Sequence, residues 1–490
     1  TELLDSQPVT KSEELAEARA LVAKAPPKGA DDETLVNFYF DRGVAAGKTG
    51  DVERQLGDLK AAERHARKVS DALTSKVLYE LGFAELFGGN WRDAVKHREE
   101  ALALNPNASD GRKLIQFALL AILYAHSGDL AKADELLAQS ESLLEEAPNW
   151  KVWDLRGDQY SKFYYWGKAD LLNFKGRHSE AEKAYLSAID FADRHAKSSI
   201  ANRFSYLHLE LIKVGQARNL VAQGRPVEAE IEARKALTLT LARLGKNHPD
   251  TAVRLRVLAE VVSDQNRPRD AEALARAALD VYRQAGVPDS AYLVGKGRSN
   301  LARYLSDQGR YEDALAVFEK MEKDFKPNSL AYERYFAADL TRAIALTLGD
   351  QAAKAKPVAE LAVQRSLKSV GPKHYNTAEA RGVLAMVLFK AGDKTAALGM
   401  FGKALPILLS RSRRSDNTDS SRAARDRRLR LILESYVGLL SDIRGTDLER
   451  ALKLDAANEA FRIADVARSR SVQGALAASG ARAAAGNRDL

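Results

Sequence analysis

The feature that most constrains the fold is a short turn-and-alanine pattern that returns along the chain at a nearly constant interval. In QGRYEDALAVFEKM, Gly309 precedes Ala314 by five residues, and apolar side chains follow four and seven residues after that alanine. Five successive copies begin at turn residues separated by 41 to 43 residues, namely Gly224, Asn266, Gly309, Asp350 and Gly392, and the copy near Asp350 is weaker. Earlier copies are spaced at 39 and 48 residues and begin at Gly50, Gly89, Gly128 and Gly176. This regularity indicates stacked repeats rather than a single compact core.

Each copy of the pattern predicts two helices joined by a tight turn. Glycine and asparagine tolerate the left-handed backbone that ends a helix. The alanine and the apolar residues four and seven places later fall on one face of the following helix, where a small side chain lets two helices approach closely. A second apolar period precedes each turn, as in Leu301, Ala302 and Leu305 before Gly309. Because neither helix can bury its apolar stripe alone, neighbouring hairpins must stack.

This pattern resembles the tetratricopeptide repeat, whose basic period is about 34 residues. The period near 42 and the stretch SNLARYLSDQGRYEDAL are similar to the kinesin-light-chain-like subtype, whose helices are longer. The resemblance implies an all-α, right-handed superhelical solenoid of antiparallel helix hairpins, acting as a protein–protein interaction scaffold. We expect an N-terminal helical cap over residues 1–30, about nine repeats over 31–410, an Arg-rich linker over 411–428 and a C-terminal helical pair over 429–490.

Two related segments mark one place in the repeat. LGKNHPDTA and VGPKHYNTA carry His248 and His374 at the same position, 126 residues apart. Because 126 is three periods of 42, repeat position explains both histidines without a catalytic or metal-binding role. The kinesin-light-chain-like family has a similar connection between repeats, and we expect Asn247 or Asp250 to cap the helix that follows in the first segment. In the second segment, Tyr375 replaces the proline of the first.

Composition and motifs give no support to an enzyme. The chain of 490 residues has no cysteine, which excludes disulfides, zinc–thiolate sites and a cysteine nucleophile within it. Its eight histidines include no i, i+4 pair of the kind that binds zinc on a helix, and no G-x-S-x-G serine motif occurs. We therefore expect a non-catalytic protein that uses no cofactor and no metal. No apolar run approaches the ~20 residues that span a bilayer.

The inner surface of the predicted repeats is the candidate site for a protein or peptide partner. Counting back from each turn residue reaches the positions of the first helix that usually face the concave groove of a tetratricopeptide array. Asn and Arg side chains there would hold the backbone and the acidic side chains of an extended peptide. The positions selected are Phe163, Trp166, Asp170, Arg218, Arg256, Glu260, Lys296, Ser299, Asn300, Arg303 and Ser306. The first three lie in an aromatic run, for which core packing between repeats is the alternative interpretation.

An arginine-rich stretch, SRSRRSDNTDSSRAARDRRLRL, follows the last clear repeat. Basic tracts bind nucleic acid through phosphate contacts, but no aromatic side chain interleaves this one for base stacking. We interpret it as a solvated linker and do not expect nucleic acid as a partner. Nucleic-acid binding through this tract and self-association through the outer surface remain the alternatives to groove recognition.

The C-terminal segment AFRIADVARSRSVQGALAASGARAA resembles the region that joins the repeats to the caspase-like CHAT domain in large bacterial tetratricopeptide-CHAT proteins. The matching residues are Ala460, Phe461, Ala464, Ala467, Arg468, Arg470, Ser471, Val472, Ala475 and Leu476. In that family the CHAT domain carries a His/Cys dyad. The resemblance implies that this chain is the sensor or regulatory part of a bacterial protease-like protein, in the cytoplasm or periplasm. Because the chain begins with Thr1 rather than Met, we expect that an N-terminal piece has been removed.

Overall fold

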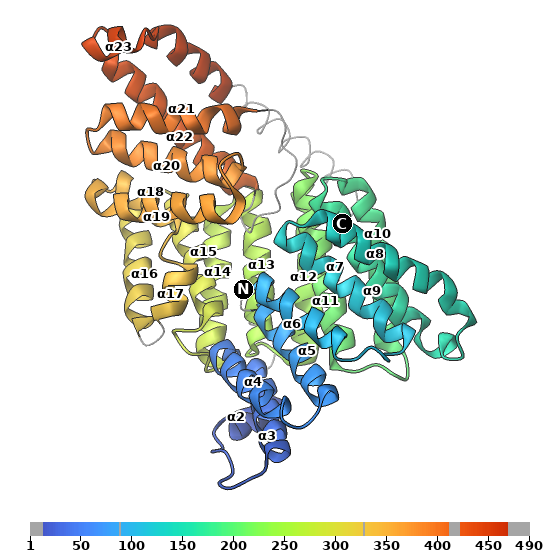
Figure 1. Ribbon diagram of the computed structural model, residues 1–490. Coiled ribbons are helices and arrows are strands. Elements are labelled where there is room, and N and C mark those ends of the chain that lie inside the picture. The colour runs from blue at the N-terminus through green and yellow to red at the C-terminus, as the bar shows by residue number, and fades with distance from the viewer. Residues whose placement is uncertain (1–12, 88–89, 327–328, 411–421, 469–490) are drawn as a thin grey trace. The chain divides into compact units, whose positions relative to one another are not determined.

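The computed structural model describes residues 13–87, 90–326, 329–410 and 422–468, and every regular element within these ranges is a helix, as predicted (Figure 1). The helices are α2 (Glu13–Val22), α3 (Asp32–Lys48), α4 (Val52–Ala66), α5 (Asp71–Phe87), α6 (Trp91–Ala103), α7 (Asp110–Ser127), α8 (Leu130–Glu146), η1 (Ala147–Asn149), α9 (Trp153–Phe174), α10 (His178–Lys197), α11 (Arg203–Ala222), α12 (Pro226–Leu244), α13 (Pro249–Asp264), α14 (Pro268–Gln284), α15 (Tyr292–Ser306), α16 (Tyr311–Asp324), α17 (Ser329–Tyr335), α18 (Leu340–Leu348), α19 (Ala352–Val370), α20 (Tyr375–Lys390), α21 (Lys394–Leu409), α22 (Arg422–Ile443) and α23 (Asp447–Leu452). Residues 456–468 are also helical. Among the described helices, none has both the length and the apolar character needed to cross a bilayer.

From α3 to α21 the helices follow one another as hairpins: α3–α4, α5–α6, α7–α8, α9–α10, α11–α12, α13–α14, α15–α16, α18–α19 and α20–α21. The turn residues between their helices adopt the left-handed conformation that the sequence predicts. Positive φ angles occur at Gly50, Gly128, Gly176, Gly224, Asn266, Gly309, Asp350 and Gly392. Asn266 and Asp350 have φ values of 60° and 57°, in the left-handed region that residues other than glycine adopt uncommonly.

The alanine that follows each turn is a contact point between helices. Ala133, Ala181, Ala229, Ala314 and Ala397 are each completely buried. A methyl group at this position allows two helix backbones to approach, and the larger apolar residues of the same face fill the space on either side. The sequence pattern, a small alanine followed by larger apolar residues, therefore reflects how the helices pack in the core.

The chain forms two compact units. Unit 1 comprises Thr1–Gln223, Glu228–Val257 and Ala277–Val294, and unit 2 comprises Gly224–Val227, Leu258–Arg276 and Gly295–Leu490. Within unit 2, the short helix α17 interrupts the regular succession of hairpins. Gly295 on α15 accommodates this insertion, because a Cβ atom there would lie 2.4 Å from the ring of Phe336.

The two histidine-containing junctions have one structure. In each, the histidine Nδ1 accepts a hydrogen bond from the backbone N–H two residues later, at 3.1 Å for both His248 and His374. In each, a threonine hydroxyl donates to the carbonyl oxygen of the junction glycine, at 2.8 Å for Thr251 and 2.7 Å for Thr377. The histidines themselves cap the helices, rather than the Asn or Asp expected from the first segment. Within the described ranges, no group of three potential metal ligands occurs.

The C-terminal part differs from the predicted boundary. Residues 422–428, which the sequence analysis assigns to the Arg-rich linker, form the first turns of α22. The rest of the predicted linker, residues 411–421, lies outside the described residues, as do 1–12 of the predicted cap and 469–490 of the predicted helical pair. Arginine and alanine both favour helix, so this stretch continues the apolar helix that follows it.

Candidate functional site

The three predicted groove residues of α9 are packed into unit 1. Phe163 is 4% exposed, and its ring centroid lies 6.4 Å from that of half-buried Trp166. Asp170 is 8% exposed and accepts a hydrogen bond from the hydroxyl of buried Tyr185. Neither Phe163 nor Asp170 is thus available to a partner, because helix packing already uses both side chains. Phe163 of the aromatic run therefore packs in the core, as in the alternative interpretation.

The two predicted arginines of unit 1 line neither of the two cavities described below. Arg218 is exposed on α11. Burial raises the pKa of Tyr185, and the positive charge of Arg218 opposes this increase. Arg256 is half-buried on α13 near Tyr282. Burial raises the pKa of Tyr282 to about 12, although Arg256 opposes this increase. Each arginine is therefore placed beside a buried tyrosine.

The predicted residues of unit 2 come together. Lys296, Ser299, Asn300 and Arg303, all on α15, line one cavity of about 350 Å³. Glu260 on α13 joins them, because its Oε1 accepts a hydrogen bond of 3.1 Å from the Asn300 side-chain amide. The periodicity of the repeat therefore placed these positions on one surface of neighbouring first helices.

The polar groups of this cavity are largely engaged within unit 2. The Ser299 hydroxyl donates to Asp339, and the Asn300 amide donates to Glu260. Arg303 is 8% exposed and donates to the hydroxyl of Tyr304 at 3.1 Å. The hydroxyl of Ser306, one turn further along, is buried without an acceptor among the described residues. Asn300 and Arg303 thus have internal partners where the sequence analysis expected an extended peptide.

A segment of the chain itself lies against this cavity. Arg428 on α22 lines it and donates to Glu379 on α20 through two hydrogen bonds of 2.9 and 3.1 Å. This two-point contact is the strong geometry for an arginine–carboxylate pair. Part of the Arg-rich tract is therefore paired with acidic side chains of the repeats.

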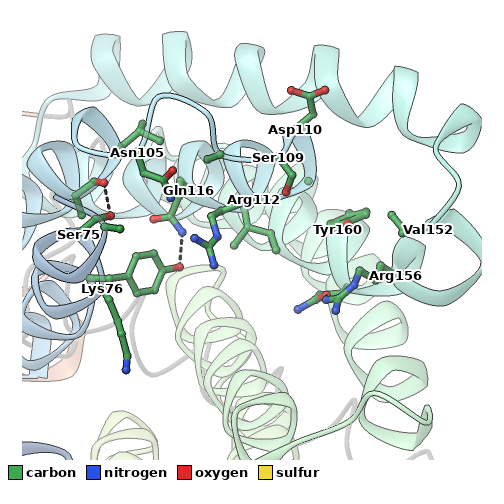
Figure 2. A pocket seen from close by; sticks show the side chains of 18 of the residues that line it. Ser75, Lys76, Asn105, Ser109, Asp110, Arg112, Gln116, Val152, Arg156 and Tyr160 are labelled. Atoms are coloured by element: carbon green, nitrogen blue, oxygen red, sulfur yellow. Dashed lines mark hydrogen bonds between the residues drawn. The ribbon is translucent and has the colours of Figure 1, made fainter. Parts of the chain in front are cut away.

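A larger cavity of about 830 Å³ lies in unit 1, formed mainly by the first turns of α5, α7 and α9 (Figure 2). Lys76, Arg112 and Arg156 line it, one from each of these helices. In Figure 2, Arg112 lies between the other two. Trp150 and Tyr160 form part of the wall, with their ring centroids 5.5 Å apart in an edge-to-face arrangement.

The three cations of this cavity have no carboxylate partner in the described part of the chain. The Lys76 ammonium lies 4.5 Å from the ring centroid of Phe40. Arg156 donates to the neutral side chain of Gln159 at 2.9 Å. Arg112 has neither an ion pair nor a hydrogen bond from its side chain among these residues. The carboxylates of Glu80 and Asp110 also line the cavity, so positive charge exceeds negative charge in its lining by one.

Unit 1 also contains the buried basic side chains of Arg98 and Lys162. Arg98 is 4% exposed, and its guanidinium lies 4.1 Å from the ring centroid of Tyr79, which lines the cavity. Lys162 is 1% exposed, with its Nζ 2.8 Å from Nδ1 of His195. Burial lowers the pKa of Lys162 to about 7. Burial, together with Lys162 and Arg156, lowers the pKa of His195 to about 4.

Three segments of the chain match the tetratricopeptide-repeat family, residues 117–139, 209–284 and 297–321. These three segments are tetratricopeptide repeats. Its matched segments include most of α7, α11 to α14, and much of α15 and α16. One helix of each cavity, α7 in unit 1 and α15 in unit 2, thus lies partly within a matched segment.

Several solved structures are similar to these tetratricopeptide repeats at low identity. BtubC from P. vanneervenii is 17% identical, with 50% of this chain and 96% of that chain covered and a TM-score of 0.40. A Rap protein complexed with competence and sporulation factor is 13% identical, with coverages of 74% and 100% and a TM-score of 0.43. Repeats described as kinesin light chain from Podosopora anserina are 16% identical, with coverages of 41% and 95% and a TM-score of 0.32. No curated protein matches this chain.

The sequence contains a signal for the unit 1 cavity that the prediction did not use. The count that selects Lys296 and Ser299 from Gly309 goes back 13 and 10 residues. The same count from Gly89 in the sequence reaches Lys76 and Tyr79, which line the cavity. The predicted positions were counted only from Gly176 onward, because the irregular spacing of the early repeats obscures their register.

Proposed function

We propose that this tetratricopeptide-repeat chain is a non-catalytic protein-interaction scaffold that binds an acidic peptide segment of a partner in the cavity of unit 1. The observation that carries the proposal is the set of three cations, Lys76, Arg112 and Arg156, which line one cavity without carboxylate partners in the described residues. Acidic side chains of a bound segment would supply those partners through charge-assisted hydrogen bonds.

The remainder of the cavity suits a peptide as well as an anion. Its volume of about 830 Å³ accommodates several side chains. Asn105 and Gln116 offer amide groups to a peptide backbone, while Trp150 and Tyr160 offer aromatic surface to an apolar side chain. A few polar groups in a largely preformed cavity, flanked by aromatic side chains, are the usual composition of a specific recognition site.

Isothermal titration calorimetry with acidic, neutral and basic dodecapeptides tests this proposal. We expect only acidic peptides to bind, and Arg112→Ala to weaken binding by about ten-fold, the value of one charge-assisted hydrogen bond. Arg64→Ala is the matched control, because Arg64 is an exposed arginine of unit 1 outside the cavity. Equal affinity of wild type and Arg112→Ala would contradict the proposal.

The same titration examines the groove predicted from the sequence. Asn300→Ala and Arg303→Ala remove the two side chains of unit 2 that were expected to hold a peptide. Because the Asn300 and Arg303 side chains have internal partners, we expect neither change to weaken binding of the acidic peptide. A loss of affinity in these variants, with Arg112→Ala unaffected, would assign the peptide to unit 2 instead.

A regulatory role is a further part of this proposal. The resemblance of residues 460–476 to the segment before a CHAT domain supports a sensor that controls a protease-like domain, although 469–476 lie outside the described residues. A coding sequence for a caspase-like domain with a His/Cys pair downstream of Leu490 would support this role, and a stop codon there would contradict it. The bacterial origin, the compartment and the absence of catalysis stay predictions.

Nucleic-acid binding through the Arg-rich tract is a weaker alternative. Arg427 and Arg428 are both engaged by carboxylates of the repeats. Phosphate contacts would have to compete with these internal pairs. Weak binding of nonspecific DNA even at low salt is the expected result, and tight binding that falls steeply with salt would overturn it.

A further inference from the structure

The first turns of α22 are bound to the repeats of unit 2 by polar contacts from α13, from α20 and from the turn after α15. Arg427 Nη2 lies 2.7 Å from Asp307 Oδ2, just after α15, and 3.1 Å from the hydroxyl of Ser263 on α13. Arg428 pairs with Glu379 on α20, as described above. These contacts span up to 164 residues of sequence.

The N-terminus of α22 is capped by another helix. The carboxylate of Asp264, the last residue of α13, accepts a hydrogen bond of 2.8 Å from the backbone N–H of Ala423. A carboxylate at this place satisfies an N–H group that has no partner within its own helix and favours the positive end of the helix dipole. The repeats of unit 2 thus contact both the arginines of α22 and the N-terminus of this helix.

Tyr375 joins the same surface. It stands where the other junction has a proline, and it is the first residue of α20. Burial raises the pKa of Tyr375 to about 12, and Glu379, Arg428 and Arg425 act on it as charged neighbours. The departure of the second junction from the first therefore lies beside the arginine-bearing turns of α22.

The two halves of α22 are held by different forces. Its first seven residues, RAARDRR, contain only alanines as apolar side chains. Its second half is apolar: Ile432, Leu439 and Leu440 are fully buried, and the ring of Tyr436 lies 4.9 Å from that of Phe401 on α21. The first half can therefore leave its contacts while the second half stays packed, since local opening follows the distribution of buried apolar contacts.

We propose that the surface formed by Ser263, Asp264, Asp307 and Glu379 is a binding groove for a helix with two adjacent arginines near its N-terminus, and that residues 422–428 are its resident ligand. Glu379 and Asp307 are 6% and 11% exposed at their side chains. Displacement by a neutral segment would leave these carboxylates buried and uncompensated, which is strongly unfavourable. A partner must therefore bring its own arginines and its own helix N-terminus.

Hydrogen exchange on the full chain tests this proposal. The probe is a stapled peptide of the sequence RAARDRRLRL, linked across the positions of Asp426 and Arg430, which are exposed in α22. In excess over wild-type chain, it should speed exchange at residues 422–430 by about ten-fold and leave 432–443 unchanged. The same peptide with both Arg427 and Arg428 replaced by alanine should have no effect.

A variant of the chain provides the second arm. Arg427→Ala with Arg428→Ala should produce the same local increase in exchange without any peptide, whereas the matched control Arg430→Ala should not. Glu379→Gln and Asp307→Asn should reduce the response of the chain to the stapled peptide. Unchanged exchange with the arginine peptide, or an equal effect of the alanine peptide, would overturn the proposal.

Discussion

The cavity of unit 1 and the groove of unit 2 are built from corresponding first helices of repeat hairpins, yet their charges are arranged differently. In unit 1, Lys76, Arg112 and Arg156 line a cavity without carboxylate partners in the described residues. In unit 2, Arg427 and Arg428 of the chain's own helix meet acidic residues of the repeats. The comparison shows that similar helices can carry different charges. In unit 2 the two arginines already have ionic partners within the chain, whereas in unit 1 the three cations have none among the described residues.

Reversal of charge in unit 1 should have the largest effect on this comparison. Arg112→Glu with Arg156→Glu replaces two attractive contacts by repulsive ones, so we expect the affinity for an acidic peptide to fall by more than about 100-fold. Calorimetry measures this loss. Arg427→Ala with Arg428→Ala in unit 2 should leave that affinity unchanged, and a similar loss in both double variants would contradict the distinction between the two surfaces.

The pH dependence of stability should reveal the buried amine of Lys162 in unit 1. The pKa of Lys162 is about 7 in the folded chain, against about 10.4 for an unfolded lysine. Between these values the unfolded chain binds more protons, so the free energy of unfolding should rise with pH, by up to about 1.4 kcal/mol per pH unit. Urea unfolding at pH 7.5 and 9.5 measures this rise.

Lys162→Met should flatten that rise, because the variant has no amine to protonate. Lys183→Met is the matched control, since Lys183 is exposed on the neighbouring helix α10. An identical pH dependence in wild type and Lys162→Met would show that the buried amine does not titrate in this range.

The two histidine junctions should give the smallest effect, and it should be equal in both units. His248→Ala and His374→Ala each remove a side-chain cap from a helix N-terminus, which costs about 1 kcal/mol. Urea unfolding followed by circular dichroism measures the change. Asparagine at either position should restore most of the loss, because it is a good cap; no difference between the alanine and asparagine variants would exclude capping as the role of these histidines.

Local features of the chain were predictable because they depend on residues close in sequence. The left-handed turns at Gly309 and Asn266 follow from the turn residues themselves. The burial of Ala314 follows from its spacing after the turn. The spacing also placed Lys296 and Asn300 beside one another in unit 2.

The state of those side chains was not predictable from the spacing. Asn300 and Arg303 were expected to bind a peptide. Instead, Asn300 donates a hydrogen bond to Glu260, and Arg303 donates one to Tyr304. Phe163 was selected by the same count and lies in the core instead. A count along one helix gives the direction of a side chain, but the neighbouring helices decide whether that direction leads to a cavity or to another side chain.

The sequence by itself determined the helix hairpins, their turns and the shared histidine junction, because each depends on interactions within a few residues or on a regular period. Only the tertiary structure revealed that residues 422–428 are helical and bound to unit 2, and that three cations from α5, α7 and α9 share a cavity in unit 1. The contact between Arg427 and Ser263 joins residues 164 positions apart, and no local period encodes such a distance. Charge complementarity between distant segments becomes visible only once the hairpins have stacked.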